Sequence, residues 1–379
     1  MALVYTEEQQ LLRDSAREFL AERSPVSAFR ELRDSGNKDG FSRQVWEEMT
    51  ELGWAGIAIP EEYDGLDFGY VGAGVIFQEM GRTLCPSPLF ASAILGAALI
   101  NRSGNASQKQ ALLPQIAAGE RIVASAIEES GHHAPENTSL VAERTDTGYR
   151  LSGSKCHVLD GHVADTLIVL ARTSGDPGDR QGLTMLLLDA EAKGLAHRHH
   201  AMVDGRNADH IELTGVMVAE TSILGQVGAA MDLLEPVLDL GQCILAAELL
   251  GIAQEAFERT IGYLKERKQF GVPIGSFQAL QHRAAILFGE IELVKSAVLK
   301  ALQAADEASP QLPYLASVAK AKASSVARET TNESIQMHGG IGMTDEFDIG
   351  FFIKRARVAE HTFGDSSYHV DRLARLKGY

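Results

Sequence analysis

Cysteine is scarce in this sequence, and basic side chains are outnumbered by acidic ones. The three cysteines, Cys85, Cys156 and Cys243, lie far apart in a chain of 379 residues, so they form neither a disulfide framework nor a zinc-ligand pattern. With 51 acidic and 35 basic side chains, the formal net charge is -16. This excess of negative charge argues against a nucleic-acid-binding surface and against docking on anionic lipid.

Long apolar runs are also missing. The longest nearly apolar run covers residues 91–100, about half of the ~20 residues that a membrane-spanning helix needs. The first ten residues contain acids and no apolar stretch of the kind found in signal peptides. We therefore expect no membrane insertion and a cytoplasmic location.

The chain is long enough for two or three domains, and the spacing of its apolar residues changes twice along the sequence. In residues 1–120 the apolar side chains recur at helical spacing, which predicts an N-terminal helical domain. Residues 121–225 contain apolar, strand-like runs between turn signals, which predicts a central β domain; the runs are 166–172, 183–190 and 210–218. The expected fold class is therefore α+β.

Helical periodicity returns in residues 226–379 and predicts a C-terminal four-helix bundle with short connections. We expect its helices over the ranges 228–267, 276–306, 313–338 and 346–362.

The connection between the first two of these helices carries side chains that packing does not require. Arg267 ends one helix, Phe270 follows it, and Gln278 begins the next helix. An arginine fork and helix-start amides near Ser276 suit the oxygens of a nucleotide diphosphate. The alternative is structural: Arg267 neutralises a helix C-terminus and Phe270 belongs to the core.

A second unusual connection follows the third helix. Gln336 lies in its last turn, and Gly339 and Gly340 come directly after it. Paired glycines allow a ligand to approach the backbone closely, but they are equally consistent with a simple helix stop.

Five segments in this order resemble the acyl-CoA dehydrogenase family of flavoproteins over nearly the whole chain. They are TEEQQLLRDSAREFL, AIEES, GYRLSGSKCHVLDGHVADTLIVLAR, YLKERKQFGVPIGSFQALQHRAA and QMHGGIGMTDEFDIGFFIKRAR. The resemblance implies an N-terminal helical domain, a central β-barrel-like domain, a C-terminal four-helix bundle and a dimer of dimers that binds FAD. It also implies that one set of residues reaches the diphosphate and adenosine side of a neighbouring subunit's FAD: Arg267, Phe270, Gln278, Gln336, Gly339 and Gly340.

Family members use a carboxylate to remove a proton α to a thioester carbonyl while a hydride leaves the β carbon for flavin N5. The commonest base is a glutamate in a Tyr-Glu-Gly-Thr segment, and the matching stretch, residues 361–366, has Gly364 at that position. Asp365 is the adjacent candidate. The alternative is that Asp365 is a helix N-cap.

A minority of the family takes its base from the helix that matches residues 238–251. Gly241 occupies that position here, but Glu248 lies two helical turns beyond on nearly the same face, within an apolar run. Apolar surroundings favour a base, because desolvation makes a carboxylate hold its proton more tightly. The alternative is an exposed glutamate on the outer face of the helix. The small residues Ala246, Ala247 and Gly251 indicate either room for a bulky acyl group or close helix packing.

The flavin-ring side also departs from the family. Relatives carry a Thr-Glu-Pro segment whose first residue contacts the ring, and the matching residues here are Glu128-Glu129-Ser130. Glu128 and the preceding Ile127 are therefore expected beside the flavin. His157 stands where relatives have a tryptophan, and Leu159 replaces a threonine that hydrogen-bonds N5. A leucine side chain has no donor, so backbone amides would have to supply that bond.

These residues leave three functions open. The first is an FAD-dependent acyl-CoA dehydrogenase that passes electrons to an electron-transfer flavoprotein, as a homotetramer or an α2β2 heterotetramer. The second is a non-catalytic or half-site subunit of a heteromeric acyl-CoA dehydrogenase, because the residues offered to a neighbour are kept while those around its own ring are altered. The third is a flavin oxidase or monooxygenase. No metal site is expected, since successive residues of the histidine-rich stretch 197–200 point to alternate strand faces.

Overall fold

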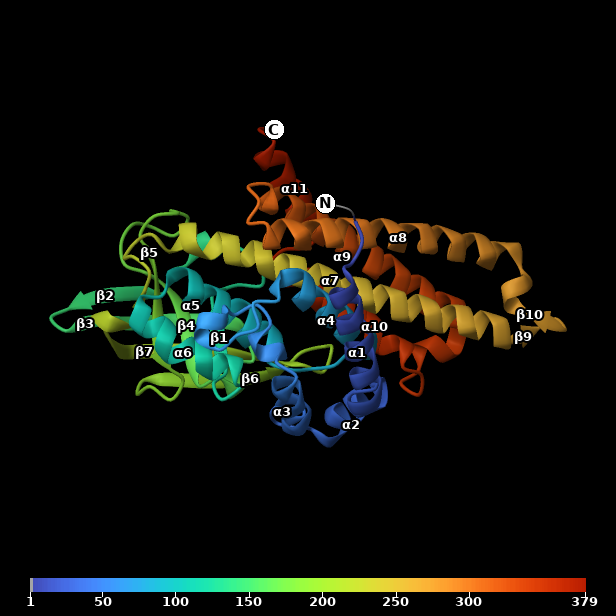
Figure 1. The fold of residues 1–379 in the computed structure, drawn as a ribbon, viewed down its shortest axis with the longest axis horizontal. Coiled ribbons are helices and arrows are strands. Elements are labelled where there is room, and N and C mark those ends of the chain that lie inside the picture. The colour runs from blue at the N-terminus through green and yellow to red at the C-terminus, as the bar shows by residue number, and fades with distance from the viewer. Residues whose placement is uncertain (1–2) are drawn as a thin grey trace. The chain divides into compact units, whose positions relative to one another are not determined.

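The computed structural model describes residues 3–379 and contains helices, then a sheet, then long helices (Figure 1). The chain forms two compact units. Among the described residues, the first comprises 3–35, 70–86 and 242–379, and the second comprises 36–69 and 87–241. The helices are α1 Glu7–Arg23, α2 Val26–Ser35, α3 Arg43–Glu51, α4 Gly69–Thr83, α5 Ala97–Ser103, α6 Ala106–Ala117, α7 Ala230–Glu266, α8 Gln278–Asp306, α9 Leu312–His338, α10 Ile349–His361 and α11 Ser366–Leu376.

Local sequence explains where several helices begin. Thr6 caps α1 by accepting a hydrogen bond from the backbone N–H of Gln9, whose side chain accepts in turn from the backbone N–H of Thr6. This reciprocal capping box satisfies two of the N–H groups that a helix start leaves without partners. Asn105 and Gln108 form the same arrangement at α6.

The second unit is built around one sheet. Its strands are β1 Val123–Ala126, β2 Val141–Thr145, β3 Gly148–Leu159, β4 Thr166–Arg172, β5 Leu183–Asp189, β6 Leu195–Ala201, β7 Asn207–Ala219 and β8 Ile223–Leu224. The order is β6-β7-β3-β2-β4-β5-β8, and β1 pairs in parallel with β4. Every residue of β4 is buried, whereas buried and exposed side chains alternate along much of β7. Residues 167–171 of β4 are all apolar, as expected for a strand covered on both faces.

The first unit contains most of the helical bundle. The parts of α7 from residue 242 onward pack with α8, α9 and α10, and the two-residue strands β9 Lys268–Gln269 and β10 Val272–Pro273 form a small hairpin between α7 and α8 (Figure 1). The α+β class with its helical bundle is confirmed, and the expected helix ranges differ from the observed ones by at most three residues at each end. Only α7 is long and apolar enough to match a membrane span among the described residues, and 89% of its most apolar stretch is buried within the protein.

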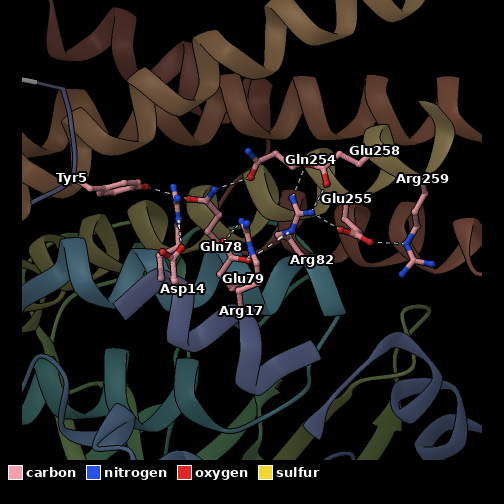
Figure 2. A network of polar contacts seen from close by, with 11 residues as sticks. Tyr5, Asp14, Arg17, Gln78, Glu79, Arg82, Gln254, Glu255, Glu258 and Arg259 are labelled. Carbon is pink, nitrogen blue, oxygen red and sulfur yellow. Dashed lines mark hydrogen bonds and ion pairs between the residues drawn. The ribbon is translucent and has the colours of Figure 1, made fainter. Parts of the chain in front are cut away.

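Polar side chains connect α1, α4 and α7 within the first unit (Figure 2). The buried carboxylate of Glu79 receives two hydrogen bonds of 3.0 Å from Arg17 and lies 3.7 Å from Arg82. Arg82 continues the network to Glu255, at 2.8 Å, and to Glu258. A buried acid next to two arginines fixes how these three helices pack, because an unpaired charge there would be costly.

Candidate functional site

The connection from α7 to α8 is a tight hairpin with an exposed tip. Arg267 directly follows α7, and its carbonyl accepts a hydrogen bond of 2.8 Å from the N–H of Ile274. Phe270 and Gly271 turn the chain in the left-handed region, with φ of 54° and 82°. Phe270 is 92% exposed, so the alternative that it belongs to the core is wrong. A large aromatic ring held in the open, on backbone with positive φ, is typical of a binding surface.

Two further groups next to this hairpin are free to bind. The exposed guanidinium of Arg267 has no hydrogen-bond or ion-pair partner among residues 3–379. Gln278 is exposed as the first residue of α8, and the helix start there has no side-chain cap. A free guanidinium and free helix-start N–H groups together favour a phosphate-bearing ligand.

The end of α9 lies near the end of α7. The imidazole of His338 stacks on the Tyr263 ring with 4.4 Å between centroids, and the Tyr263 hydroxyl donates to the His338 carbonyl at 3.3 Å. After His338 the chain enters a short 3-10 segment, η8 Gly339–Met343. The structure thus brings the two predicted connections, residues 266–281 and 336–343, to the same end of the bundle.

The paired glycines leave open space. Gly339 has a φ of 68°, and a Cβ added at Gly339 or Gly340 would meet nothing within 4 Å. Gln336 is exposed on the preceding turn. An open backbone beside an exposed amide fits close approach by the diphosphate end of FAD, so the residues present are compatible with that cofactor.

The ring-side residues lie in the second unit, where their neighbours already bond to one another. The Glu128 carboxylate contacts the His133 imidazole at 2.5 Å, and the carbonyl of Glu128 accepts from the N–H of Cys156 at 2.8 Å. His157 is exposed at a β-bulge with φ of 52°, and its Nδ1 lies 3.2 Å from the Cys156 sulfur. Leu159 is half-buried at the end of β3.

Lys155 ties the two ring-side segments together. Its buried ammonium donates to the Ile127 carbonyl at 2.9 Å and lies 2.9 Å from Glu129. Burial lowers the pKa of Lys155 to about 8, while Glu129 acts in the opposite direction. The pKa of Glu129 is lowered; its burial opposes this, and the ammonium of Lys155 is the largest favourable cause.

Glu248 is buried, as a base in an apolar run requires, but its carboxylate is fully engaged. Its side chain is 2% exposed, so the alternative of an outer-face glutamate is wrong. Arg355 of α10 donates to both oxygens, from Nε to Oε1 at 2.8 Å and from Nη2 to Oε2 at 2.6 Å. Such a two-bond pair compensates the buried negative charge and uses one lone pair on each oxygen.

Asp365 caps α11: its Oδ1 accepts from the N–H of Tyr368 at 2.9 Å. The preceding Gly364 cannot be replaced easily, because its φ is 97° and an added Cβ would lie 2.2 Å from the Tyr368 ring. The N-cap interpretation of Asp365 is therefore confirmed, and the position that carries the commonest family base admits only glycine in this backbone conformation.

Two buried cations near these carboxylates were not predicted from sequence. Lys320 on α9 donates to the carbonyls of Glu360, at 2.8 Å, and of Gly364, at 2.9 Å, and burial lowers its pKa to about 7. Arg355 lies 107 residues from Glu248 in the chain. In the sequence each has another cation within two residues, Lys322 and Lys354 respectively, so no signal marked which cation is buried.

Helices α4 and α7 pack through glycines. A Cβ at Gly251 would lie 1.8 Å from the Gln78 carbonyl oxygen, and a Cβ at Gly81 would lie 2.3 Å from that of Glu248. Ala246 and Ala247 are fully buried. The small residues of α7 thus serve close helix packing, the second of the two interpretations that the sequence left open.

Comparisons with known proteins agree with this architecture. Models of the acyl-CoA dehydrogenase N-terminal, middle and C-terminal domains match residues 6–120, 124–216 and 231–377. The probable acyl-CoA dehydrogenase YngJ of Bacillus subtilis (strain 168) is 31% identical over 375 residues, which cover 97% of each protein. A variant of the Tcur3481-Tcur3483 steroid acyl-CoA dehydrogenase is 30% identical, with a TM-score of 0.87 over 98% of each chain. The glutaryl-coenzyme A dehydrogenase in complex with glutaryl-CoA is 26% identical, with a TM-score of 0.90 over 100% of this chain and 98% of that one. This chain therefore belongs to the acyl-CoA dehydrogenase family of FAD-dependent oxidoreductases.

Proposed function

We propose that the chain acts in the α,β-desaturation of an acyl-CoA thioester, in an assembly whose FAD site combines residues from two chains. FAD, when bound, supplies the hydride acceptor, N5. The chain's own residues have to grip the cofactor, accept the α-proton and exclude water. Side chains that have no partner within the described chain indicate which of these tasks this chain performs and which a second chain performs.

The available groups are those of the α7–α8 and α9–η8 connections. Arg267 has no partner in the described chain, Phe270 is exposed, and Gly339 and Gly340 present open backbone. The single observation that carries the proposal is this set of unused binding groups at one end of the bundle. We propose that, with Gln278 and Gln336, they hold the diphosphate and adenosine side of an FAD whose ring lies against another chain.

For a chain that is active by itself, we propose Asp365 rather than Glu248 as the base. The second carboxylate oxygen of Asp365 has no hydrogen-bond partner in the described residues, so it can accept a proton without breaking the cap. Both oxygens of Glu248 are bonded to Arg355, and protonating that carboxylate would leave a buried guanidinium uncompensated.

A second candidate is a half-site subunit whose partner provides the base. Three observations favour it: Gly364 admits no side chain, Glu248 is paired, and Glu128, where relatives contact the ring, bonds to His133. The steroid acyl-CoA dehydrogenase that resembles this chain carries the names of two proteins. By analogy we propose that the half-site subunit forms an α2β2 assembly that acts on a bulky acyl group. If the chain is active by itself, the first candidate, we propose a homotetramer.

Anaerobic bleaching of bound flavin separates the two candidates. The chain is purified alone, its FAD content is measured from the visible absorbance, and short-chain, branched-chain and steroid acyl-CoA thioesters are added. If Asp365 is the base, flavin bleaches in the wild type and not in Asp365→Asn, while Glu248→Gln retains bleaching per bound flavin. If the chain is a half-site, bleaching requires a companion chain and Asp365→Asn has no effect on it.

Reoxidation identifies the electron acceptor. We propose that an electron-transfer flavoprotein accepts the electrons from the reduced flavin and that the chain is cytoplasmic. Slow reoxidation by oxygen with rapid transfer to an artificial acceptor supports a dehydrogenase. Rapid peroxide formation would instead support the oxidase alternative.

A further inference from the structure

The turn η8 is mostly exposed, and Gly342 is its buried residue, packed against Ile335 and His338 of α9. Ile341 and Met343 are exposed, the latter by 80%, and Gly339 and Gly340 touch nothing within 4 Å at their Cβ positions. The hydroxyl and N–H of Thr344 bond back to the Ile341 carbonyl at 2.8 and 3.1 Å, which closes the turn locally. Local bonds close the loop, and the buried Gly342 holds it on the last turn of α9; the far end of the loop, after Thr344, has a separate anchor.

The next residue supplies that anchor. Asp345 receives a two-pronged hydrogen bond from Arg33 of α2, with both N–O distances at 2.7 Å. Arg30, one helical turn earlier, donates to the backbone carbonyl of Asp345 at 2.7 Å and to Asp348 at 2.7 Å. Two arginines of the N-terminal region therefore hold both the side chain and the backbone of the segment that follows η8.

The arginines are themselves held in place. Their guanidinium groups lie over the Phe351 ring of α10, at 4.5 Å for Arg30 and 4.7 Å for Arg33, and Phe29 meets the same ring edge-on at 5.3 Å. Planar guanidinium groups that stack on an aromatic ring lose little further freedom when they bond a carboxylate. The clamp is thus pre-organised, unlike an isolated surface ion pair.

The clamp also joins the network of Figure 2. Arg259, which bonds Glu255 at 2.8 Å, lies 3.6 Å from the second oxygen of Asp348. The contacts therefore run without interruption from the buried Glu79 region through α7 to the start of α10.

We propose that Arg30 and Arg33 are positioning residues for FAD: through Asp345 they set the place of Gly339–Met343, and with it the affinity of the assembly for the cofactor. The inference rests on the proposed function, since it requires that η8 contacts FAD. The N-terminal helices then contribute to cofactor binding without touching it. Because the clamp orders the turn before FAD binds, the binding step does not carry the entropy cost of ordering it.

The test compares two aspartates that bond the same arginine. Asp345→Asn removes the negative charge beside η8 and replaces one of the two oxygens that accept from Arg33 by an amide NH2. Asp34→Asn makes the same change at another acceptor of Arg33, 2.8 Å from its Nε, that does not follow η8. Apo-protein, in its native assembly, is titrated with FAD and followed by flavin fluorescence. We expect Asp345→Asn to weaken FAD binding by about tenfold, Arg33→Lys to be intermediate, and Asp34→Asn to stay within about twofold.

Two readouts keep the outcomes distinct. Thermal unfolding of the apo-protein should be nearly equal for the two asparagine variants, because the side chains of both aspartates are more than half exposed, at 54% for Asp34 and 62% for Asp345. Gly340→Leu, which fills the open backbone, tests the proposed function itself. If Gly340→Leu weakens FAD binding and Asp345→Asn does not, the clamp inference is wrong; if neither changes the affinity, η8 does not contact FAD. Equal losses of affinity in Asp345→Asn and Asp34→Asn also overturn the inference.

Discussion

Replacing Glu248 by Gln separates a structural carboxylate from a catalytic one. The side chains of Glu248 and Arg355 are 2% and 9% exposed, and two hydrogen bonds join them. Removing one partner of a buried ion pair costs about 3–5 kcal/mol, because the remaining charge has no compensation. Glutamine keeps one acceptor oxygen and the shape of the side chain, so we expect a loss of about 3 kcal/mol in the free energy of unfolding.

Urea unfolding followed by circular dichroism measures this loss, and flavin reduction per bound FAD is measured on the same preparation. Glu360→Gln is the matched control, since Glu360 is equally buried, bonds Arg328 and Arg357, and is not a candidate base. Both variants should lose stability while reduction per bound flavin stays within about threefold of wild type.

A paired replacement tests the cause. Glu248→Leu combined with Arg355→Met removes both charges, and it should recover most of the stability lost in Glu248→Gln, because a well-packed apolar pair avoids the cost of burying ions. Our reasoning is refuted if Glu248→Gln unfolds at the wild-type urea concentration but reduces flavin at least a hundredfold more slowly. That result would make Glu248 the base.

Three further perturbations follow from the geometry. Burial lowers the pKa of Lys320 from 10.5 to about 7, so between these pH values the unfolded state binds more protons than the folded state. The free energy of unfolding of the wild type should therefore rise from pH 7 to pH 9, by at most about 1.4 kcal/mol per pH unit. Lys320→Met should flatten this pH dependence in urea titrations. Gly364→Ala should destabilise the protein by about 2–3 kcal/mol, because the methyl group meets the Tyr368 ring and φ is positive; an unchanged midpoint would contradict the observed corner. Phe270→Ala should leave the unfolding midpoint unchanged, since the ring is exposed, and should weaken FAD binding in the assembly; unchanged affinity would remove Phe270 from the site.

The sequence was sufficient for features that repeat along the chain. Helical periodicity placed α7 to α10 within three residues, and the glycine pair at 339 and 340 marked the end of α9 correctly. These features depend on neighbours a few residues away. Hydrophobic spacing and turn residues are properties of a short window, so they can be read without knowing the tertiary structure.

The remaining features depend on partners far away in the chain. Glu248 was correctly expected to be desolvated, but its pairing with Arg355 came from another helix. The hairpin β9–β10 has only two residues per strand, too few to produce an alternating pattern. The clamp on Asp345 joins residues more than 300 positions apart. A single sequence gives no information on which of many arginines bonds which of many acids.

Gly364, which directly precedes the N-cap of α11, limits which substitutions this protein can accept there. A glutamate codon there would introduce a side chain into volume already taken by the Tyr368 ring, on a backbone that disfavours any Cβ. The tyrosine would have to be replaced first, and the corner rebuilt, before an acid at that place could be selected. Descendants of this gene are therefore expected to keep whatever proton acceptor they now use, and to inherit any dependence on a companion gene that supplies it.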